Sequence, residues 1–392
     1  MVIESDGHHC IIEVMCQQIP SQVTSHPVLL SCMDCLRNLC KSSRQGRMAI
    51  INSEMITQAT DVTCEFMLQV SCNSGDFQTS KISALSCSLL TQLSRSILHR
   101  KNIAKNESIL ELCSKIVGTE KNYETVCEAT KLLAALAPTL ADNSTINFTA
   151  ESLAETFTLV LKRNSPLLSD ESGNAEQLYW YYELLSVASG GLSCVINHLS
   201  TASRNAFLET ASRHFQALVV LSDNVARSTE PPAWSDAAGM LAYTLTDLFV
   251  KMSLEESWRL LWTESRIVSN FFLMIILYDL ALEECNGQPL PDACNTPYWS
   301  SARTNCLQCI SSLLCTDSST QLFIAGLERA MSLPSSVDSE TANRDCCYRL
   351  SHHDTWVNCV AFQHFLQAAE RISSSDDSYA ATVASIIISK LI

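Results

Sequence analysis

Apolar residues recur at three- and four-residue steps along most of the chain, which is the spacing of one face of an α-helix. The clearest stretch runs over 28–40 and is followed by a polar turn at 41–46, a short apolar segment at 48–51 and a second helical stripe at 56–70. No strand-type alternation competes with this pattern. We therefore predict an all-α fold whose unit is a long helix, a polar turn, a short helix and another long helix.

The same layout returns further along the chain. The segment GRMAIINSEMI at 46–56 has counterparts in RKNIAKNESI at 100–109 and in RLLWTESRI at 259–267. The first counterpart follows the original by 53 residues, and the next helical stripe follows after another 44 residues. Steps of this size are typical of helical repeat units with loops of variable length. Ser253 and Glu256 have the spacing of a capping box that opens the third copy.

The repeats predict one continuous array over residues 1–392. The N-terminal half, 1–165, holds the clearest units, and the C-terminal half, 176–392, holds looser helical pairs. Between them the polar stretch 162–177 is predicted to be an exposed loop. Pro138 is predicted to close the helix in which it lies, because proline disrupts a helix interior.

The segment LRNLCKSSRQGRMAIINSEMI at 36–56 resembles the armadillo/HEAT repeat superfamily. It has an L-x-N-L core, a polar turn and a run of spaced isoleucines, and the resemblance extends over roughly half of the chain. The glycine expected before the last helix of a repeat is replaced by Ser53-Glu54 or Asn106-Glu107. The resemblance implies a right-handed α-solenoid of about seven repeats. It does not imply an armadillo receptor for nuclear-localisation signals, because no tryptophan here is followed four residues later by asparagine.

Stacked repeats form an extended concave surface that suits a peptide or a helix of a partner protein. The polar positions near the repeated turns are the best candidates for contacting such a partner. The predicted partner-binding residues are Arg37, Asn38, Arg44, Arg47, Gln92 and Arg100.

The charge balance bears on the kind of partner. The formal net charge is −15, which argues against direct contact with nucleic acid, because nucleic-acid binders usually carry a basic face. An acidic surface could attract a protein partner with a basic segment, or could serve solubility alone. The longest unbroken apolar run, 271–278, is far shorter than the roughly 20 residues of a membrane span. The N-terminus shows no signal-peptide pattern, so we expect a cytoplasmic or nuclear protein.

Nineteen cysteines raise the question of thiol or metal chemistry. The C-x-x-C pairs at 32–35 and 306–309 lie on helical stripes, so we interpret them as core positions, where free cysteine behaves as a small hydrophobe. Weak candidates for a zinc site are Cys346, Cys347, His352 and His353, and a weaker cluster is His8, His9 and Cys10. Neither has the paired spacing of a known zinc motif, and the sequence predicts no cofactor.

Six tryptophans and an aromatic run at 179–182 could belong to the core or to a binding surface. Aromatic residues with a polar group are favoured at binding hot spots. They are equally natural between stacked helices. We predict core positions both for the run at 179–182 and for Trp258 and Trp262, which lie one helical turn apart.

The sequence therefore predicts a non-enzymatic scaffold or adaptor. One alternative is a regulatory or assembly domain, or a truncated product, of a larger multidomain protein, because the apolar stripe at 381–391 has no polar capping helix after it. A second alternative is a Cys/His-dependent metal-binding or thiol enzyme, although no local catalytic signature marks one.

Overall fold

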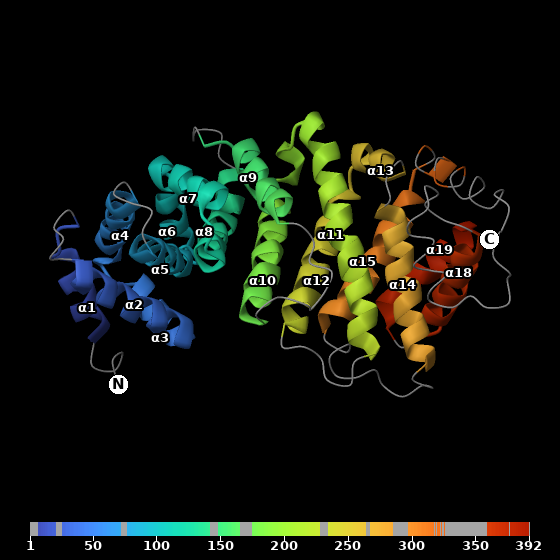
Figure 1. The fold of residues 1–392 in the computed structure, drawn as a ribbon, viewed down its shortest axis with the longest axis horizontal. Coiled ribbons are helices and arrows are strands. Elements are labelled where there is room, and N and C mark those ends of the chain that lie inside the picture. Colours follow the sequence, from blue (N-terminus) through green and yellow to red (C-terminus); the bar gives the residue numbers. More distant parts are fainter. Residues whose placement is uncertain are drawn as a thin grey trace. The chain divides into compact units, whose positions relative to one another are not determined.

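The computed structural model describes residues 7–20, 26–71, 77–141, 148–164, 175–227, 234–263, 267–284, 297–316, 359–375 and 377–391, with a few single residues between 318 and 325. Every regular element in these ranges is a helix (Figure 1), so the all-α prediction is confirmed. The right-handed solenoid of about seven repeats stays a prediction.

The chain forms two compact units. The first comprises residues 1–160 and 190–199, and the second comprises 161–189 and 200–392. Two long helices, α9 (Ala150–Arg163) and α10 (Ala175–Leu192), pass from one unit into the other. In the stretch 162–177, predicted to be an exposed loop, residues 162–163 and 175–177 are helical and exposed, and 165–174 lie outside the described residues.

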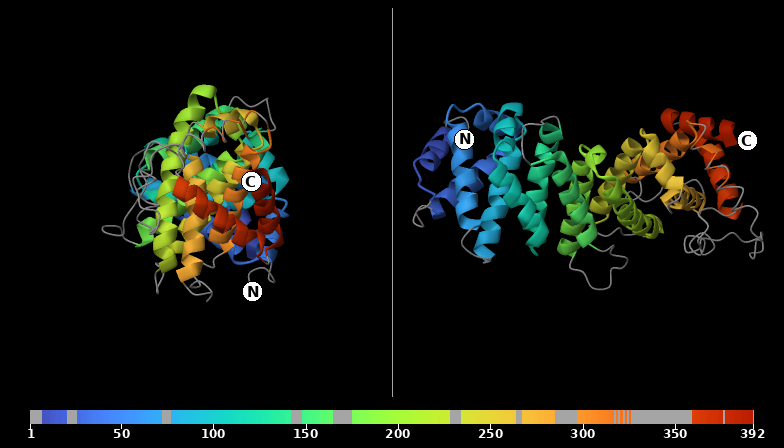
Figure 2. Two further views of the ribbon diagram at one scale, coloured as in Figure 1. Left: turned by 90° about the vertical axis from the view of Figure 1, so that its right-hand side faces the viewer. Right: turned by 90° about the horizontal axis from the view of Figure 1, so that it is seen from above.

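The helices of the first unit follow one another in chain order, from the blue end to the cyan end (Figures 1 and 2). Helix α5 lies at its centre and packs against α2, α4 and α8. The predicted order of long, short and long helix is present twice, in α2–α3–α4 and in α5–α6–α7. The bounds are α1 Gly7–Cys16, α2 His26–Ser42, α3 Arg44–Ile51, α4 Ile56–Ser71, α5 Phe77–Leu93, α6 Ile97–Ala104, α7 Glu107–Thr119 and α8 Tyr123–Ala141.

Two boundary predictions in this unit are wrong. The polar turn predicted at 41–46 is a single residue, Ser43, whose hydroxyl accepts a 2.8 Å hydrogen bond from the Gly46 amide and so caps α3. Pro138 does not close α8, which continues to Ala141. Leu140 is buried beyond the proline, and this burial favours the extra helical turn.

In the second unit, several helices pack against partners that are not their neighbours in the chain. Helix α12 packs on α15, α11 packs on α14, and α18 packs on α14 and α19 (Figure 1). The bounds are α11 Thr201–Arg227, α12 Ser235–Met252, α13 Glu256–Thr263, α14 Ile267–Glu284, α15 Pro297–Leu313, α18 Cys359–Ser373 and α19 Ser378–Leu391; a 3-10 helix over Ile196–His198 belongs to the first unit.

An aromatic cluster lies at the centre of this second unit. Phe215, Phe249 and Phe271 come from three different helices, and their ring centroids are 5.6–5.8 Å apart. Trp262 packs edge-on against Phe249 and Phe271. Trp258 and Trp262 are both fully buried, which confirms that they are core residues. The core prediction also holds for Tyr181 and Tyr182, which are buried, but it is wrong for Tyr179, which is 44 % exposed.

The helices at the end of the chain are tied to the rest of the second unit by polar contacts. The Arg371 guanidinium in α18 forms an ion pair with the buried Asp279 carboxylate in α14. The Lys390 ammonium in α19 donates to the Leu314 carbonyl over 2.7 Å. Along α19 the apolar side chains are divided: Val383 and Ile387 are buried, and Ile386 is 41 % exposed.

None of the described helices is long and apolar enough by itself to cross a membrane. One pair, 256–262 with 267–277, reaches the required length and composition together, with a bend of 78° between its members.

Two adjacent glycines in α10 provide a test of packing in the first unit. A Cβ at Gly191 would lie 2.5–2.9 Å from the Phe157 ring, whereas a Cβ at Gly190 would meet nothing within 4 Å. Gly191→Ala is therefore expected to lower the free energy of unfolding by about 1–3 kcal/mol through overpacking. Gly190→Ala is expected to be neutral or to add up to about 1 kcal/mol, because alanine favours helix. Urea denaturation followed by circular dichroism measures both, and equal shifts would contradict the close approach.

Candidate functional site

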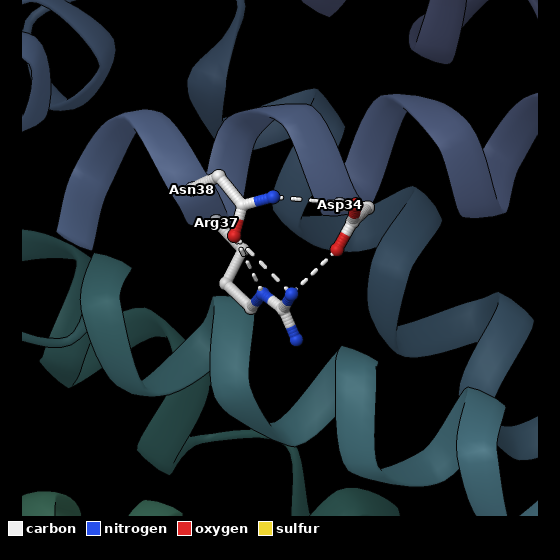
Figure 3. A network of polar contacts seen from close by, with 3 residues as sticks. All are labelled: Asp34, Arg37 and Asn38. Carbon is white, nitrogen blue, oxygen red and sulfur yellow. Dashed lines mark hydrogen bonds and ion pairs between the residues drawn. The ribbon is translucent and has the colours of Figure 1, made fainter. Parts of the chain in front are cut away.

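The predicted site residues on α2 form a local polar network (Figure 3). The Arg37 guanidinium donates to the Asp34 carboxylate over 2.6 Å and to the Asn38 side-chain oxygen over 3.2 Å. The Asn38 amide donates to the other Asp34 oxygen over 3.2 Å. Asn38 is exposed and Arg37 is half-buried. The network fixes a guanidinium and an amide on the surface of α2 in one arrangement.

Two further site residues bind the backbone of the preceding helix. Arg47 in α3 donates to the Cys40 carbonyl of α2 over 3.4 Å, and Arg100 in α6 donates to the Ser94 carbonyl after α5 over 2.9 Å. The last carbonyls of a helix have no intrahelical partner, and a cation there also interacts favourably with the helix dipole. Both arginines are half-buried and hold the start of a short helix against the end of a long one.

A third arginine, which the sequence prediction missed, makes the same contact in the second unit. Arg259 in α13 is 7 % exposed and donates to the carbonyl of Ser253, the C-cap of α12. The signal for it was present, because Arg100 and Arg259 are the first residues of their copies of the repeated segment and Arg47 is the second residue of the first copy. Ser253 does not form the predicted capping box, since its hydroxyl donates to the Val250 carbonyl and lies 3.1 Å from the Ser312 hydroxyl in α15.

The remaining two site residues lie in opposite surroundings. Arg44 is exposed at the first position of α3. Gln92 is 7 % exposed in α5, and its side-chain oxygen has no hydrogen-bond partner among the described residues. Burial excludes Gln92 from direct contact with a partner in this conformation.

The two turns of the first unit lie next to each other. His99 in α6 donates from Nε2 to the Ile51 carbonyl of α3 over 3.2 Å. Burial raises the pKa of the Cys40 thiol to about 11, and the nearby guanidinium groups of Arg47 and Arg95 act in the opposite direction. One guanidinium group from each turn therefore lies near Cys40, close to the end of α2.

The cysteines behave mostly as core residues. Burial raises the pKa of the Cys306 and Cys309 thiols, and both are fully buried, as predicted. The first C-x-x-C pair is divided, because Cys32 is buried but Cys35 is exposed. Burial also raises the pKa of Cys64 to about 12. A raised pKa keeps a thiol protonated at neutral pH and therefore poorly nucleophilic.

Of the two predicted metal-site clusters, only the one at residues 8–10 lies among the described residues. Cys346, Cys347, His352 and His353 lie outside the described residues. His9 lies 3.3 Å from the Ser53 hydroxyl, so it links α1 to the turn after α3. Within the part of the chain that the structure describes, no three His, Cys, Asp or Glu side chains converge on a position that could hold a metal ion.

A cavity of about 220 Å³ lies beside His214 in the second unit, between the end of α9 and α11. The buried His214 donates from Nε2 to the Leu161 carbonyl over 2.9 Å. Glu209 and Arg213, which form an exposed 3.1 Å ion pair, also line the cavity. This histidine satisfies a carbonyl at the end of α9, so its first role is structural.

His214 is expected to make stability depend on pH. Burial lowers its pKa below the ordinary value of about 6.5, and the neighbouring Arg213 acts in the same direction. The unfolded chain then binds a proton that the folded chain does not bind, so this contribution is present above about pH 6.5 and is lost as the pH falls below it. His214→Gln should flatten the loss of stability between about pH 7 and pH 5, measured by urea denaturation at each pH. Substitution of the exposed His198 by glutamine serves as the control, and an unchanged profile in His214→Gln would contradict the prediction.

Comparisons with known proteins do not identify a family for this chain. No protein-family model matches the sequence, and no curated protein matches it. Among solved structures, the crystal structure of SYS-1 at 2.6 Å resolution aligns with 97 % of this chain and 63 % of that chain, at 14 % identity and a TM-score of 0.47. The chain thus spans less than two thirds of the length of SYS-1, and a similarity at this level says nothing about function.

Proposed function

We propose that the chain is a non-enzymatic scaffold: a right-handed α-solenoid of about seven armadillo/HEAT-like repeats that binds a peptide or a helix of a partner protein. The observation that carries the proposal is the recurrence of one contact. In the turns α2–α3, α5–α6 and α12–α13, an arginine donates to a carbonyl at the end of the preceding long helix. Repetition of the same turn supports one supersecondary unit used several times, as in solenoids whose surfaces bind extended partners.

The binding residues in this proposal are those of the first unit that reach solvent. Arg37 and Asn38 offer hydrogen-bond donors held in place by Asp34, and Arg44 offers an exposed guanidinium. Arg47 and Arg100 support the turns on which these residues lie. A regulatory or assembly domain of a larger protein would use the same surface.

Site-specific crosslinking tests the scaffold proposal. The full chain carries a photoreactive amino acid at Asn38 or Arg44, and the matched control carries it at the exposed Lys115 of α7. The crosslinked protein is identified by mass spectrometry, produced in pure form and titrated against the chain by calorimetry. We expect a protein that crosslinks from 38 and 44 more strongly than from 115 and binds directly. The absence of direct binding by any crosslinked protein would overturn the proposal.

Solution scattering tests the solenoid separately. A compact chain of 392 residues has a radius of gyration of about 21 Å. An extended array of repeats is expected to give a clearly larger value, and a value close to 21 Å would contradict the solenoid while leaving the binding experiment unaffected.

A further inference from the structure

Two turn segments of the first unit have a charge opposite to that of the whole chain. The segments 41–53 and 94–106 contain seven of the 26 lysines and arginines and none of the 41 aspartates and glutamates. The remainder of the chain therefore has 19 basic and 41 acidic residues. We call these two segments together the basic turn surface.

The segments are neighbours in space as well as alike in composition. The hydrogen bond from His99 to the Ile51 carbonyl joins α6 to α3. The guanidinium groups of Arg47 from one segment and Arg95 from the other both act to lower the pKa of the Cys40 thiol, so both lie near it. The long helices that precede them, α2 and α5, pack against each other. The two turns that carry these positive charges are therefore adjacent in the folded unit.

Most of these cations are available for a partner. Five of the seven are exposed, and their side chains make no hydrogen bond or ion pair with the described residues: Lys41, Arg44, Arg95, Lys101 and Lys105. The other two, Arg47 and Arg100, are the half-buried arginines that bind helix carbonyls. At these turns two cations therefore bind helix carbonyls, and five others are exposed to solvent.

Large apolar side chains lie among the exposed cations. Ile97 is 68 % exposed, Leu98 is 64 % exposed and Met48 is 47 % exposed. Exposed hydrophobic residues grouped with charged ones are typical of a protein-binding surface. The basic turn surface contains no Phe, Tyr or Trp, although aromatic side chains are the usual stacking platform for single-stranded nucleic acid. These features favour a peptide over a nucleic acid.

We propose that the basic turn surface is the docking site for an acidic segment of a partner protein in which aspartates and glutamates are interspersed with apolar residues. The proposal rests on the scaffold function proposed above and names the chemistry of the partner. The carboxylates pair with the exposed lysines and arginines, and the apolar side chains cover Met48, Ile97 and Leu98. An acidic segment, and not the basic one expected from the net charge, fits this surface.

The acidity of the remaining chain would sharpen such binding. An acidic peptide is repelled by most of the surface and attracted to the basic turns, so its encounters concentrate there. Like-charge repulsion elsewhere also disfavours binding at other places. The association rate should accordingly fall with added salt.

A random 15-residue peptide library displayed on phage and selected on the purified full chain tests the proposal. The selected peptides are synthesised with a fluorescent label, and their binding is measured by anisotropy. The test variant is Arg44→Glu/Arg95→Glu/Lys101→Glu. The matched control is Lys81→Glu/Lys115→Glu/Lys121→Glu, which reverses three exposed lysines of the same unit outside the basic turn surface and changes the net charge equally. Ile97→Ser/Leu98→Ser tests the apolar contribution, with the 75 % exposed Leu254→Ser of the second unit as its control.

The proposal predicts that the selected peptides are rich in acidic and apolar residues. Each exposed ion pair contributes modestly, but the test variant removes three of them, so the affinity of the selected peptides should fall on the order of tenfold or more. The affinity should fall little in the control variant. The Ile97→Ser/Leu98→Ser variant should also bind more weakly. All substituted side chains are exposed, so we expect every variant to fold. Circular dichroism checks this.

Other outcomes separate this inference from the scaffold proposal. Selection of basic peptides, equal binding to both triple variants, or preferential binding of a labelled oligothymidylate to the unmodified chain would overturn the inference. A partner identified by crosslinking at 38 or 44 would then still support the scaffold. Failure to select any peptide, together with failure of the crosslinking experiment, would overturn both.

Discussion

Replacement of Trp262 by alanine is expected to lower the free energy of unfolding of the second unit by about 3–5 kcal/mol. The side chain is fully buried and lies against rings from two other helices, with centroids 6.4 Å from Phe249 and 5.6 Å from Phe271. Its removal leaves a cavity where α12, α13 and α14 meet, and the surrounding rings can collapse only partly into it. Urea denaturation followed by circular dichroism gives the size of the loss.

Trp180→Ala is the matched control for this cavity. Trp180 lies in α10 of the same unit and is only half-buried. The surface that it exposes already in the folded chain contributes nothing to stability on folding, so its loss should be clearly smaller. A similar loss in both variants would show that the aromatic cluster is not the main core of this unit.

The second large effect is expected at the repeated arginine. Arg259→Met keeps the length of the apolar stem but removes the guanidinium that donates to the Ser253 carbonyl. A buried carbonyl without a partner costs about 1–3 kcal/mol, so we expect a loss of about 2 kcal/mol. The corresponding changes Arg100→Met and Arg47→Met should cost less, because both side chains are half-buried and water can replace the donor.

The order of the three losses is the test of the shared turn. We expect Arg259 to exceed Arg100 and Arg100 to exceed Arg47, whose contact is the longest at 3.4 Å. Each variant is measured by thermal and urea denaturation, and the half-buried positions also by hydrogen exchange at the turn. Equal losses at the three positions, or no loss at Arg259, would contradict a structural role graded by burial.

Helix positions were predictable because each long helix buries one face, and burial imposes a spacing that can be seen in the sequence. Helix boundaries were less predictable, since they depend on contacts made elsewhere. Pro138 is a helix breaker by local rules, but the burial of Leu140 extends α8 past it. Ser43 occupies the whole turn between α2 and α3, because one side-chain cap is enough to start the short helix.

Candidate site residues were predictable only as polar residues near turns. Sequence could not separate Arg47 and Arg100, which bind helix carbonyls, from Arg44, which is exposed, because the distinction depends on where the end of the preceding helix lies. Cys32 is buried and Cys35 is exposed for a similar reason. Neighbouring helices cover one face of α2, and the residues of α2 alone do not determine how far around the helix this covered face extends.

The reactivity of the buried thiols can be used to measure local unfolding of each unit. Cys64, Cys87 and Cys113 are buried in the first unit, with Cys87 and Cys113 sulfurs 4.0 Å apart, and Cys306 and Cys309 are buried in the second. A thiol reagent must wait until the surrounding helices separate before it can modify them. Alkylation read out residue by residue by mass spectrometry would therefore report the opening rate of each unit, with the exposed Cys10 and Cys35 as internal references for unhindered reaction.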